Sequence, residues 1–428
     1  MGSLFENPTL SQTLESPLAI PNSNGIPSPP LSATPPPVNN EEGFAHHIHP
    51  LTTATPSTHT MGASLTRYLA IKVHQLVLAR PYSRILIIGS YARYSPSSVA
   101  FNLEKTDKPF NWERPTARHD TNTDTLHIEC FPGMDHLSHY AEIIATYLSL
   151  LSVMQPELDL TPANRVVYLP TSPSDTHLAL QSQTNLSEFP GGGVHTVILG
   201  QVWHLPSLTS DSSWSGTGPF QWIITTSPVS GRRVAYLGFR PAFWGDISGE
   251  VIHFLTGRWK SIREVVYLGK LGVLRKGVRP NKWLATGGES LVGGVAGPGS
   301  GVGQGGMATV RWESVLAEAV QGSEKARGCT IVGRHVTLGS VLHETREWYE
   351  GMKDRAEFVD PEIGMMALAA VRSGVGFGYL HIITDNLGEK YEEDLSNERE
   401  EGVLRGRKRL RRVVEEVVGV YVNSTPGR

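Results

Sequence analysis

The sequence predicts an α/β protein with a mostly parallel central sheet flanked by helices, preceded by a disordered N-terminal tail. Short unbroken apolar runs, of which Arg84–Gly89 is the clearest, are typical of strands buried on both faces of a parallel sheet. Segments with apolar residues at helical spacing separate several of these runs. Strands that alternate with helices in this way indicate an α/β fold.

The expected tail covers residues 1–60. This segment contains eleven prolines, four acidic residues and no lysine or arginine, a composition that favours disorder. The remaining 368 of the 428 residues are enough for one large domain or two small ones.

The folded part begins with a predicted helix. Ser64 is a plausible N-cap residue ahead of an apolar stripe at helical spacing, and the helix should end near Pro81. The strand Arg84–Gly89 follows. Further strands are predicted at residues 126–131, 165–169, 196–199, 222–225, 234–238, 265–269 and 377–384. Further helices are predicted at residues 136–154, 247–259, 310–319, 342–353 and 363–373.

Two segments interrupt this pattern. Gly287–Gly306 contains ten glycines in twenty residues, so we expect a mobile insertion without a core element. A phosphate-binding loop is the alternative, although no lysine follows in the required register. The predicted domain extends over residues 61–395, and residues 396–428 are expected to form a charged helical tail.

Composition excludes several classes of protein. The two cysteines, Cys130 and Cys329, are too few for a disulfide framework or a four-thiolate metal site, which favours a reducing compartment. The N-terminal residues do not form a signal peptide, and eighteen uninterrupted apolar residues occur nowhere in the chain. We therefore expect a cytoplasmic protein with no membrane partner, no metal and no cofactor.

The most specific pattern lies near the C-terminal end. A strand-like run ends at Asp360, Glu362 lies at the start of a helical pattern, and a later strand-like run ends in Thr384 and Asp385. This pattern resembles the nucleoside phosphorylase and nucleosidase superfamily, in which a strand runs into Asp-x-Glu at a helix start and a following strand ends in Ser-Asp. The resemblance implies a nucleoside-phosphorylase-like fold. Earlier parts of that fold are similar to Ile85–Ser90, as its first strand, and to Val265–Leu274, as its strand and glycine turn before the base pocket.

The resemblance also implies roles. Glu362 would accept hydrogen bonds from ribose hydroxyls, Asp385 would face the purine, and Asp360 would lie in the substrate-binding region. The alternatives are that Asp360 only caps the helix and that Glu362 only interacts with the helix dipole. Thr384 replaces the usual serine, Pro361 replaces a methionine, and no arginine pair stands in a phosphate-binding frame, which argues against phosphorolysis.

A second resemblance starts from Asp385-Asn-Leu-Gly-Glu389. The two carboxylates would share one face if the chain turned helical after the strand. This D-x-x-x-E pattern is similar to that of the fungal arginine-containing cyclodipeptide synthases. It implies an aminoacyltransferase of secondary metabolism that joins arginine from arginyl-tRNA to a second aminoacyl group, giving a cyclo(Arg-Xaa) diketopiperazine.

The residues suit that chemistry. Asp385 and Glu389 could pair with a guanidinium or accept a proton from an attacking amine, and their roles are interchangeable in the sequence. Ser90, after the first strand, is a candidate substrate-binding residue or nucleophile, with simple turn chemistry as the alternative. A basic run could contact tRNA phosphates, or it could be a solvated helix face. Its cations are Arg405, Arg407, Lys408, Arg409, Arg411 and Arg412.

The sequence therefore predicts a tRNA-dependent cyclodipeptide synthase whose partners are aminoacyl-tRNAs. Two further functions stay open. One is a purine nucleoside phosphorylase or nucleosidase, and the other is a non-catalytic nucleoside-binding relative.

Overall fold

The structure is a computed structural model that describes residues 51, 54–91, 96–104, 110, 113–209, 213–293 and 306–425. Residues 48–428 group into one compact unit. Most of the expected tail at 1–60 lies outside the described residues. The last part of this segment is packed against the folded unit, because His59 is fully buried and forms a β-bridge with Thr345. The folded unit therefore begins earlier than residue 61.

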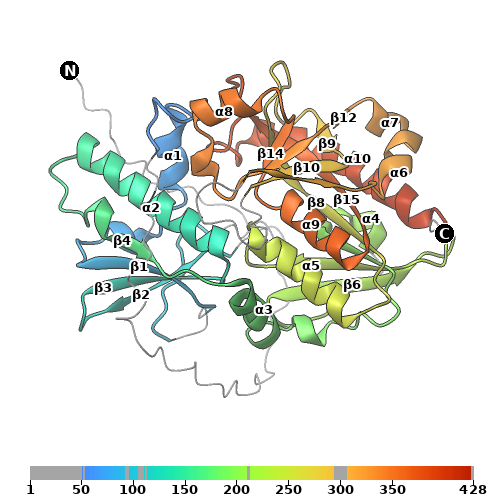
Figure 1. The fold of residues 1–428 in the computed structure, drawn as a ribbon, viewed down its shortest axis with the longest axis horizontal. Helices are drawn as coiled ribbons and strands as arrows, with labels where there is room; N and C mark the ends of the chain where they lie inside the picture. The colour runs from blue at the N-terminus through green and yellow to red at the C-terminus, as the bar shows by residue number, and fades with distance from the viewer. Residues whose placement is uncertain are drawn as a thin grey trace, which may run out of the picture. The chain divides into compact units, whose positions relative to one another are not determined.

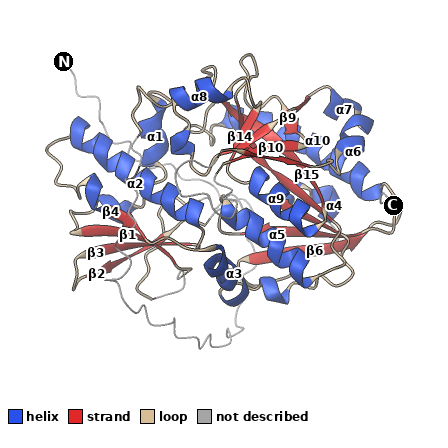
Figure 2. Cartoon of the chain, viewed as in Figure 1, coloured by secondary structure: helices blue, strands red, loops and turns tan. Residues whose placement is uncertain are grey.

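Two sheets are present where the sequence predicted one (Figures 1 and 2). The smaller has the strand order β2-β3-β1-β4. In it β1 runs parallel to β3 and β4, and β2 runs antiparallel to β3. The strands are β1 (Arg84–Gly89), β2 (Thr116–Asp120), β3 (Thr125–Cys130) and β4 (Val166–Tyr168). Ile85–Ser90 is thus not the first strand of the large sheet, which corrects the expectation from the family resemblance.

Helices close one side of the small sheet. The long helix α2 (Met134–Met154) lies across β1 and β4, and α1 (Ser64–Ala70) packs against α2. Apolar residues of α1, α2, β1 and β3 form one buried cluster. The predicted first helix is shorter than expected: it ends at Ala70, and a 3₁₀ turn, η1 (Gln75–Leu78), follows before Pro81.

The larger sheet holds eleven strands among the described residues. Its centre is β8, which is parallel to β5 and β15 and antiparallel to β14. The first strands are β5 (Thr196–Gly200), β6 (Phe220–Thr226), β7 (Arg233–Phe239), β8 (Glu264–Val273), β9 (Leu284–Thr286) and β10 (Glu289–Val292). The others are β11 (Ala308–Arg311), β12 (Thr330–Val332), β13 (His335–Thr337), β14 (Phe358–Asp360) and β15 (Gly376–Asn386).

Helices cover both faces of this sheet. α5 (Asp246–Arg258) and α9 (Ile363–Ser373) lie side by side on one face, where their apolar residues pack against β8 and β15 (Figure 1). α10 (Glu401–Asn423) buries Leu410, Val417 and Val418 against the other face. The expected charged tail at 396–428 is therefore part of the packed unit, because one side of its helix is apolar. Shorter helices are α3 (Pro173–Ser182), α4 (Pro206–Thr209), α6 (Ala317–Gly322), α7 (Glu324–Arg327) and α8 (Arg346–Met352), with 3₁₀ turns η2 (Ala163–Arg165), η3 (Leu186–Glu188), η4 (Val202–His204) and η5 (Val341–His343).

Two helix N-termini meet between the sheets, and each receives a carboxylate from the other helix. Asp246 of α5 accepts hydrogen bonds from the backbone N–H groups of Met134 (2.8 Å) and Asp135 (3.3 Å). Asp135 of α2 accepts one from the N–H of Asp246 (3.1 Å). Burial raises the pKa of both acids, that of Asp246 to about 7 with a further contribution from Asp135. This reciprocal cap joins the helix over the small sheet to a helix over the large one.

The sequence misassigned three segments. Residues 310–319, expected as a helix, contain the end of β11, and the helix α6 begins only at Ala317. Residues 342–353 contain the turn η5 and the shorter helix α8. The glycine-rich segment 287–306 contains the buried strand β10, so the expectation of no core element is wrong there. Its residues 294–305 lie outside the described residues.

Candidate active site

The strands β8 and β15 bring Lys270 and Asp385 together near the carboxyl ends of two parallel strands. The register shifts between Ile383 and Asp385, so Asp385 lies beside Gly272. A Cβ atom on residue 272 would lie 2.9 Å from Asp385 Oδ2, so glycine leaves the space that this carboxyl fills. The expected glycine turn within 265–274 is wrong, because these residues continue β8 through Val273. The carboxyl edge of such strands is where open α/β sheets bind ligands.

Glu362 reaches the same region from β14 and α9. It is the N-cap residue of α9, but its side chain does not cap the helix. Asp360 does so instead, since its Oδ1 accepts hydrogen bonds from the N–H groups of Glu362 (2.9 Å) and Ile363 (2.8 Å). The carboxyl group of Glu362 is thereby left available, and its charge couples to that of Lys270.

Asp360 itself is held in place by two buried histidines. His335 Nε2 lies 3.0 Å from Asp360 Oδ1, and His381 Nδ1 lies 3.6 Å from Oδ2. Burial alone would raise the pKa of Asp360, but His335, His381 and the N–H of Ile363 hold it below its usual range. Asp360 is therefore a buried anion that fixes the start of α9, as in the capping alternative, and it positions Glu362.

The pKa values of Asp385 and Glu362 are shifted in the opposite direction from that of Asp360. Burial raises the pKa of Asp385 to about 6, opposed by the hydroxyl of Thr384 and the charge of Lys270. Burial and the charge of Asp360 raise the pKa of Glu362 well above its usual range. Apart from the Thr384 hydroxyl on Asp385, no side chain of the described residues donates a hydrogen bond to either group. Buried acids with raised pKa values and free oxygens are typical of groups that move protons or bind polar ligands.

Lys270 brings a cation next to these acids. Its Nζ lies 2.6 Å from Glu398 Oε2, and its pKa is lowered by burial against the opposing effect of Glu398. Arg407 Nη1 lies 3.5 Å from the same Glu398 oxygen, and its Nε donates to Asn281 (2.8 Å). Glu398 thus forms ion pairs with both Lys270 and Arg407.

Three further residues lie near Lys270, Glu362 and Asp385. The sequence analysis did not identify these three, or Lys270, as site residues. Glu344 follows η5 and is 7% exposed. Tyr68 comes from α1, and its pKa is raised by burial and then by the charge of Glu344. Tyr267 comes from β8, and its pKa is raised by burial and then by Glu362. A lysine close to two glycines in a largely apolar strand is a sequence signal that could have pointed here, since Lys270 follows Gly269 and lies two residues before Gly272 in β8.

The expected pairing of Asp385 with Glu389 is not formed. β15 continues through Asn386 and a turn follows, so residues 385–389 are not helical. Glu389 is exposed, and its Oε2 accepts hydrogen bonds from the N–H of Gly277 (2.8 Å) and the hydroxyl of Tyr391 (2.8 Å). The two carboxylates do not share one helix face, because the strand extends further than the sequence suggested.

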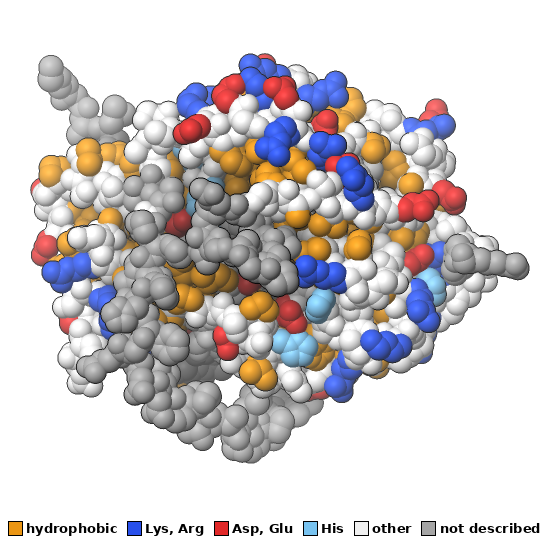
Figure 3. Space-filling model, in the orientation of Figure 1, with side chains coloured by type: hydrophobic (Ala, Val, Ile, Leu, Met, Phe, Trp, Pro, Cys, Tyr) orange, Lys and Arg blue, Asp and Glu red, His pale blue; other side chains and the backbone are white. Residues whose placement is uncertain are grey.

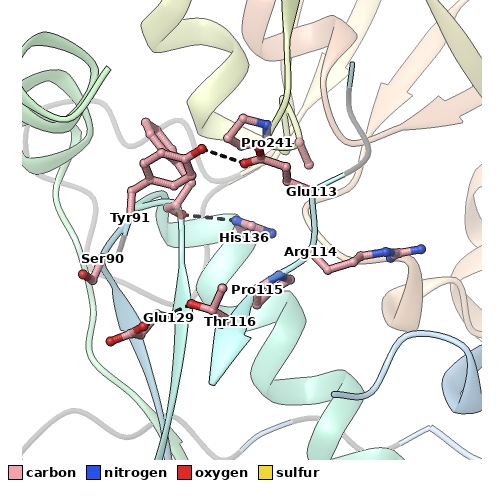
Figure 4. Close-up of a pocket in the computed structure, with 11 residues that line it drawn as sticks. Ser90, Tyr91, Glu113, Arg114, Pro115, Thr116, Glu129, His136 and Pro241 are labelled. Atoms are coloured by element: carbon pink, nitrogen blue, oxygen red, sulfur yellow. Dashed lines mark hydrogen bonds between the residues drawn. The ribbon is translucent and has the colours of Figure 1, made fainter. Parts of the chain in front are cut away.

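Ser90 lies in another part of the molecule. It follows β1 of the small sheet, where its N–H donates to the carbonyl of Cys130 (2.8 Å). Figure 4 shows it beside a small cavity together with Tyr91, Glu113 and His136. The cavity has a volume of about 20 Å³, which suits a single water molecule. Among the described residues, Ser90 Oγ has no histidine or carboxylate partner that would activate it as a nucleophile.

The basic run of α10 divides between two environments. Arg407 is buried at 1% exposure, and Arg411 is partly buried. The exposed cations follow one helix face at intervals of three and four residues, namely Arg405, Lys408, Arg409 and Arg412. Arg405 pairs with Glu401. On the face drawn in Figure 3, basic and acidic side chains are both scattered over the surface. Two of the six expected phosphate-binding residues are therefore turned toward the protein interior.

The described residues contain no group of three His, Cys, Asp or Glu side chains that could hold a metal ion. Among their helices, none combines the length and apolar character needed to cross a membrane.

No family model matches the chain, and no curated protein matches it. Solved structures do show a partial likeness. The 5′-methylthioadenosine/S-adenosylhomocysteine nucleosidase of Campylobacter jejuni is 13% identical with a TM-score of 0.42, covering 53% of this chain and 98% of the nucleosidase. The corresponding nucleosidase of Colwellia psychrerythraea, in complex with adenine, is 12% identical with a TM-score of 0.40, covering 53% of this chain and 93% of that one. Futalosine hydrolase of Helicobacter pylori is 14% identical with a TM-score of 0.40, covering 53% and 99%.

Proposed function

We propose that the protein hydrolyses the N-glycosidic bond of a purine nucleoside. The observation that carries this proposal is the pair of half-buried residues Glu362 and Asp385 at the carboxyl edge of the large sheet, whose carboxyl groups receive no side-chain hydrogen bond from the described residues except that of the Thr384 hydroxyl on Asp385. Their placement on a helix start after one strand and at the end of the next agrees with the motif that suggested a nucleoside.

The chemistry follows from these environments. A purine leaves more easily as a neutral base, so an acid that is protonated near neutral pH accelerates departure. Asp385, with a pKa raised to about 6, is suited to donate that proton. Glu362 is suited to hydrogen-bond the ribose hydroxyls, and the charge of Lys270 acts on both acids.

The test is release of free base. Purified protein is incubated with adenosine, inosine, guanosine and 5′-methylthioadenosine, without and with inorganic phosphate, and products are separated by chromatography. We expect free base in the absence of phosphate, and at least a hundredfold loss in Asp385→Asn because removing a positioned general acid typically costs that much. Asp354→Asn, an exposed carboxylate, is the matched control. Full activity of Asp385→Asn would rule out this mechanism.

Cyclodipeptide synthesis stays a prediction, since the comparisons do not support it and Glu389 is exposed on a turn. It has its own arm in the experiment. A cyclic arginine-containing product from arginyl-tRNA and a second charged tRNA, without release of base from any nucleoside, would replace the present proposal.

A further inference from the structure

Ser290, His335 and Asp360 form a buried triad behind the start of α9. Ser290 Oγ lies 2.9 Å from His335 Nδ1, and His335 Nε2 lies 3.0 Å from Asp360 Oδ1. Ser290 and His335 are 0% exposed, and Asp360 is 5% exposed, so no substrate reaches the serine. Nε2 has no hydrogen bond to any other group of the described residues, so the two ring nitrogens of His335 connect only the serine and the aspartate.

Strand register explains why these side chains meet. In the parallel pair of β10 and β13, Ser290 is the partner of His335. In the parallel pair of β13 and β14, Thr337 is the partner of Asp360. His335 and Thr337 are two residues apart in one strand, so their side chains point to the same face of the sheet. That face carries α9, because Thr337 Oγ1 accepts a hydrogen bond from the N–H of Gly364 (3.0 Å).

The first turn of α9 is thereby held at three consecutive backbone N–H groups. Asp360 Oδ1 accepts those of Glu362 (2.9 Å) and of the next residue (2.8 Å), and Thr337 Oγ1 accepts the third. A Cβ atom on residue 364 would lie 2.7 Å from Ser290 Oγ, so glycine allows this close approach. Ser290 Oγ also lies 3.3 Å from Thr337 Oγ1, which joins the two acceptors of the turn into one network.

The acceptors determine how protons are arranged in this network. A carboxylate only accepts, so the proton on Nε2 of His335 belongs to the contact with Asp360. In a neutral ring Nδ1 is then an acceptor, and the Ser290 hydroxyl donates to it. Thr337 Oγ1 accepts the N–H of Gly364 and has its own proton left for Ser290 Oγ. Every donor therefore points along the network toward Asp360.

We propose that Ser290 and His335 are positioning residues that set the preference of Glu362 for a sugar with free hydroxyls. They act through Asp360, whose carboxylate holds the backbone N–H of Glu362. A carboxyl group that must meet two neighbouring hydroxyls tolerates little displacement of the helix start that carries it. A sugar without those hydroxyls gains nothing from the exact placement of Glu362. This inference rests on the proposed function.

The first test compares substrates with and without the hydroxyls. Wild type, Ser290→Ala and His335→Leu are assayed for base release from adenosine and from 2′,3′-dideoxyadenosine. We expect kcat/KM for adenosine to fall about tenfold in Ser290→Ala and up to about a hundredfold in His335→Leu, since small displacements of a positioned group cost this much. The values for dideoxyadenosine should change by less than about threefold. An equal loss for both substrates would show a general structural effect and overturn the proposal.

His335→Gln guards the test against misfolding. The glutamine amide can donate a hydrogen bond to Asp360, and leucine cannot. His335→Gln should therefore keep more of the preference for adenosine than His335→Leu does. His253→Leu, at an exposed position of α5, is the matched control and should retain the wild-type preference. If the glutamine and leucine variants at position 335 fold and lose the preference equally, donation by His335 does not position Glu362.

A second test does not need catalysis. Nitrogen-15 NMR spectra of the full chain with labelled histidine distinguish protonated from unprotonated ring nitrogens, and the His335 signals are those missing in His335→Gln. We expect the proton on Nε2 in wild type and a mixture of both tautomers in Ser290→Ala, because Nδ1 loses its donor. A proton on Nδ1 in wild type would overturn the proposed arrangement.

Failure of the proposed function would be recognised separately. If wild type releases base from no nucleoside, that function is rejected, and calorimetry with adenosine and 2′,3′-dideoxyadenosine decides on the role of the triad. Tighter binding of adenosine that Ser290→Ala abolishes would support the inference. Equal binding of the two nucleosides, or binding of neither, would overturn it.

Discussion

The missing side chain at residue 272 determines where Asp385 can lie. A Cβ atom at this position would also approach Leu387 Cδ1 at 2.9 Å and Val359 Cγ1 at 3.2 Å. We expect Gly272→Ala to displace the Asp385 carboxyl, lower base release at least tenfold and destabilise the protein by about 1–3 kcal/mol, the usual range for overpacking. Activity assays and urea unfolding measure both effects.

Gly257→Ala is the matched control for this substitution. Gly257 lies within α5, and an added Cβ atom there meets nothing within 4 Å. It should stabilise the protein by about 0.5–1 kcal/mol, since alanine favours helix more than glycine does. Equal effects of the two substitutions would contradict the steric account of residue 272.

Asp385 should also make stability depend on pH. Its pKa is raised from 3.8 to about 6 in the folded protein, so its contribution is complete below about pH 4 and is lost as the pH rises through 6. Asp385→Asn cannot ionise and should therefore be more stable than wild type at pH 8, by about 2–3 kcal/mol, and similar at pH 4. Urea titrations at both pH values measure this, and a less stable variant at pH 8 would show that the ionised carboxylate is stabilised in the fold.

Within α10, position on the helix separates a structural cation from a surface one. Arg407 is buried and contacts Asn281 and Glu398, whereas Arg409 is exposed on the opposite side. We expect Arg407→Ala to lower the free energy of unfolding by about 3 kcal/mol because Glu398 loses a buried partner. Arg409→Ala should change it by less than about 0.5 kcal/mol. If instead Arg407→Ala weakens tRNA binding at unchanged stability, the phosphate-binding interpretation of the basic run would be restored.

A helix or strand could be predicted when the residues that start and end it lie within or next to it in the sequence. α9 was predicted at its exact bounds, Ile363–Ser373, because Asp360 caps it and Gly374 ends it in the left-handed region. β1 was predicted with the same bounds, since Arg84–Gly89 is an apolar run that follows a proline and closes with a glycine. The short strands β9, β12 and β13 have three residues each and were missed, because such segments become strands through their neighbours.

Strand partners and site neighbours depend on the whole chain. The sequence could not show that β1 belongs to a separate sheet, since the same apolar run fits either sheet. It placed Asp360, Glu362 and Asp385 correctly on a helix start and a strand end. It missed Glu344 and Tyr68, which lie in a loop and a helix remote in sequence, and it paired Asp385 with Glu389 only because the end of β15 was set two residues too early.

The connection between the two sheets should respond to pH through Asp246. Its pKa is raised to about 7 by burial and by Asp135, so stability from this group should decrease as the pH rises from about 4 to 7. Asp246→Asn keeps one acceptor oxygen for the N-terminus of α2 and removes the repulsion, and it should flatten the stability profile between pH 5 and 8. The exposed Asp159→Asn should retain the wild-type slope, and an equally steep profile for Asp246→Asn would argue against the effect.

The pairing of β8 with β15 has a consequence for biosynthesis. The two strands are more than one hundred residues apart in the chain, whereas β1, β3 and β4 of the small sheet all lie within residues 84–168. Contacts between distant segments form slowly, because a long loop must close first. On the ribosome the small sheet can therefore assemble before β8 pairs with β15. The residues that surround Lys270 come together only after translation has passed Asn386.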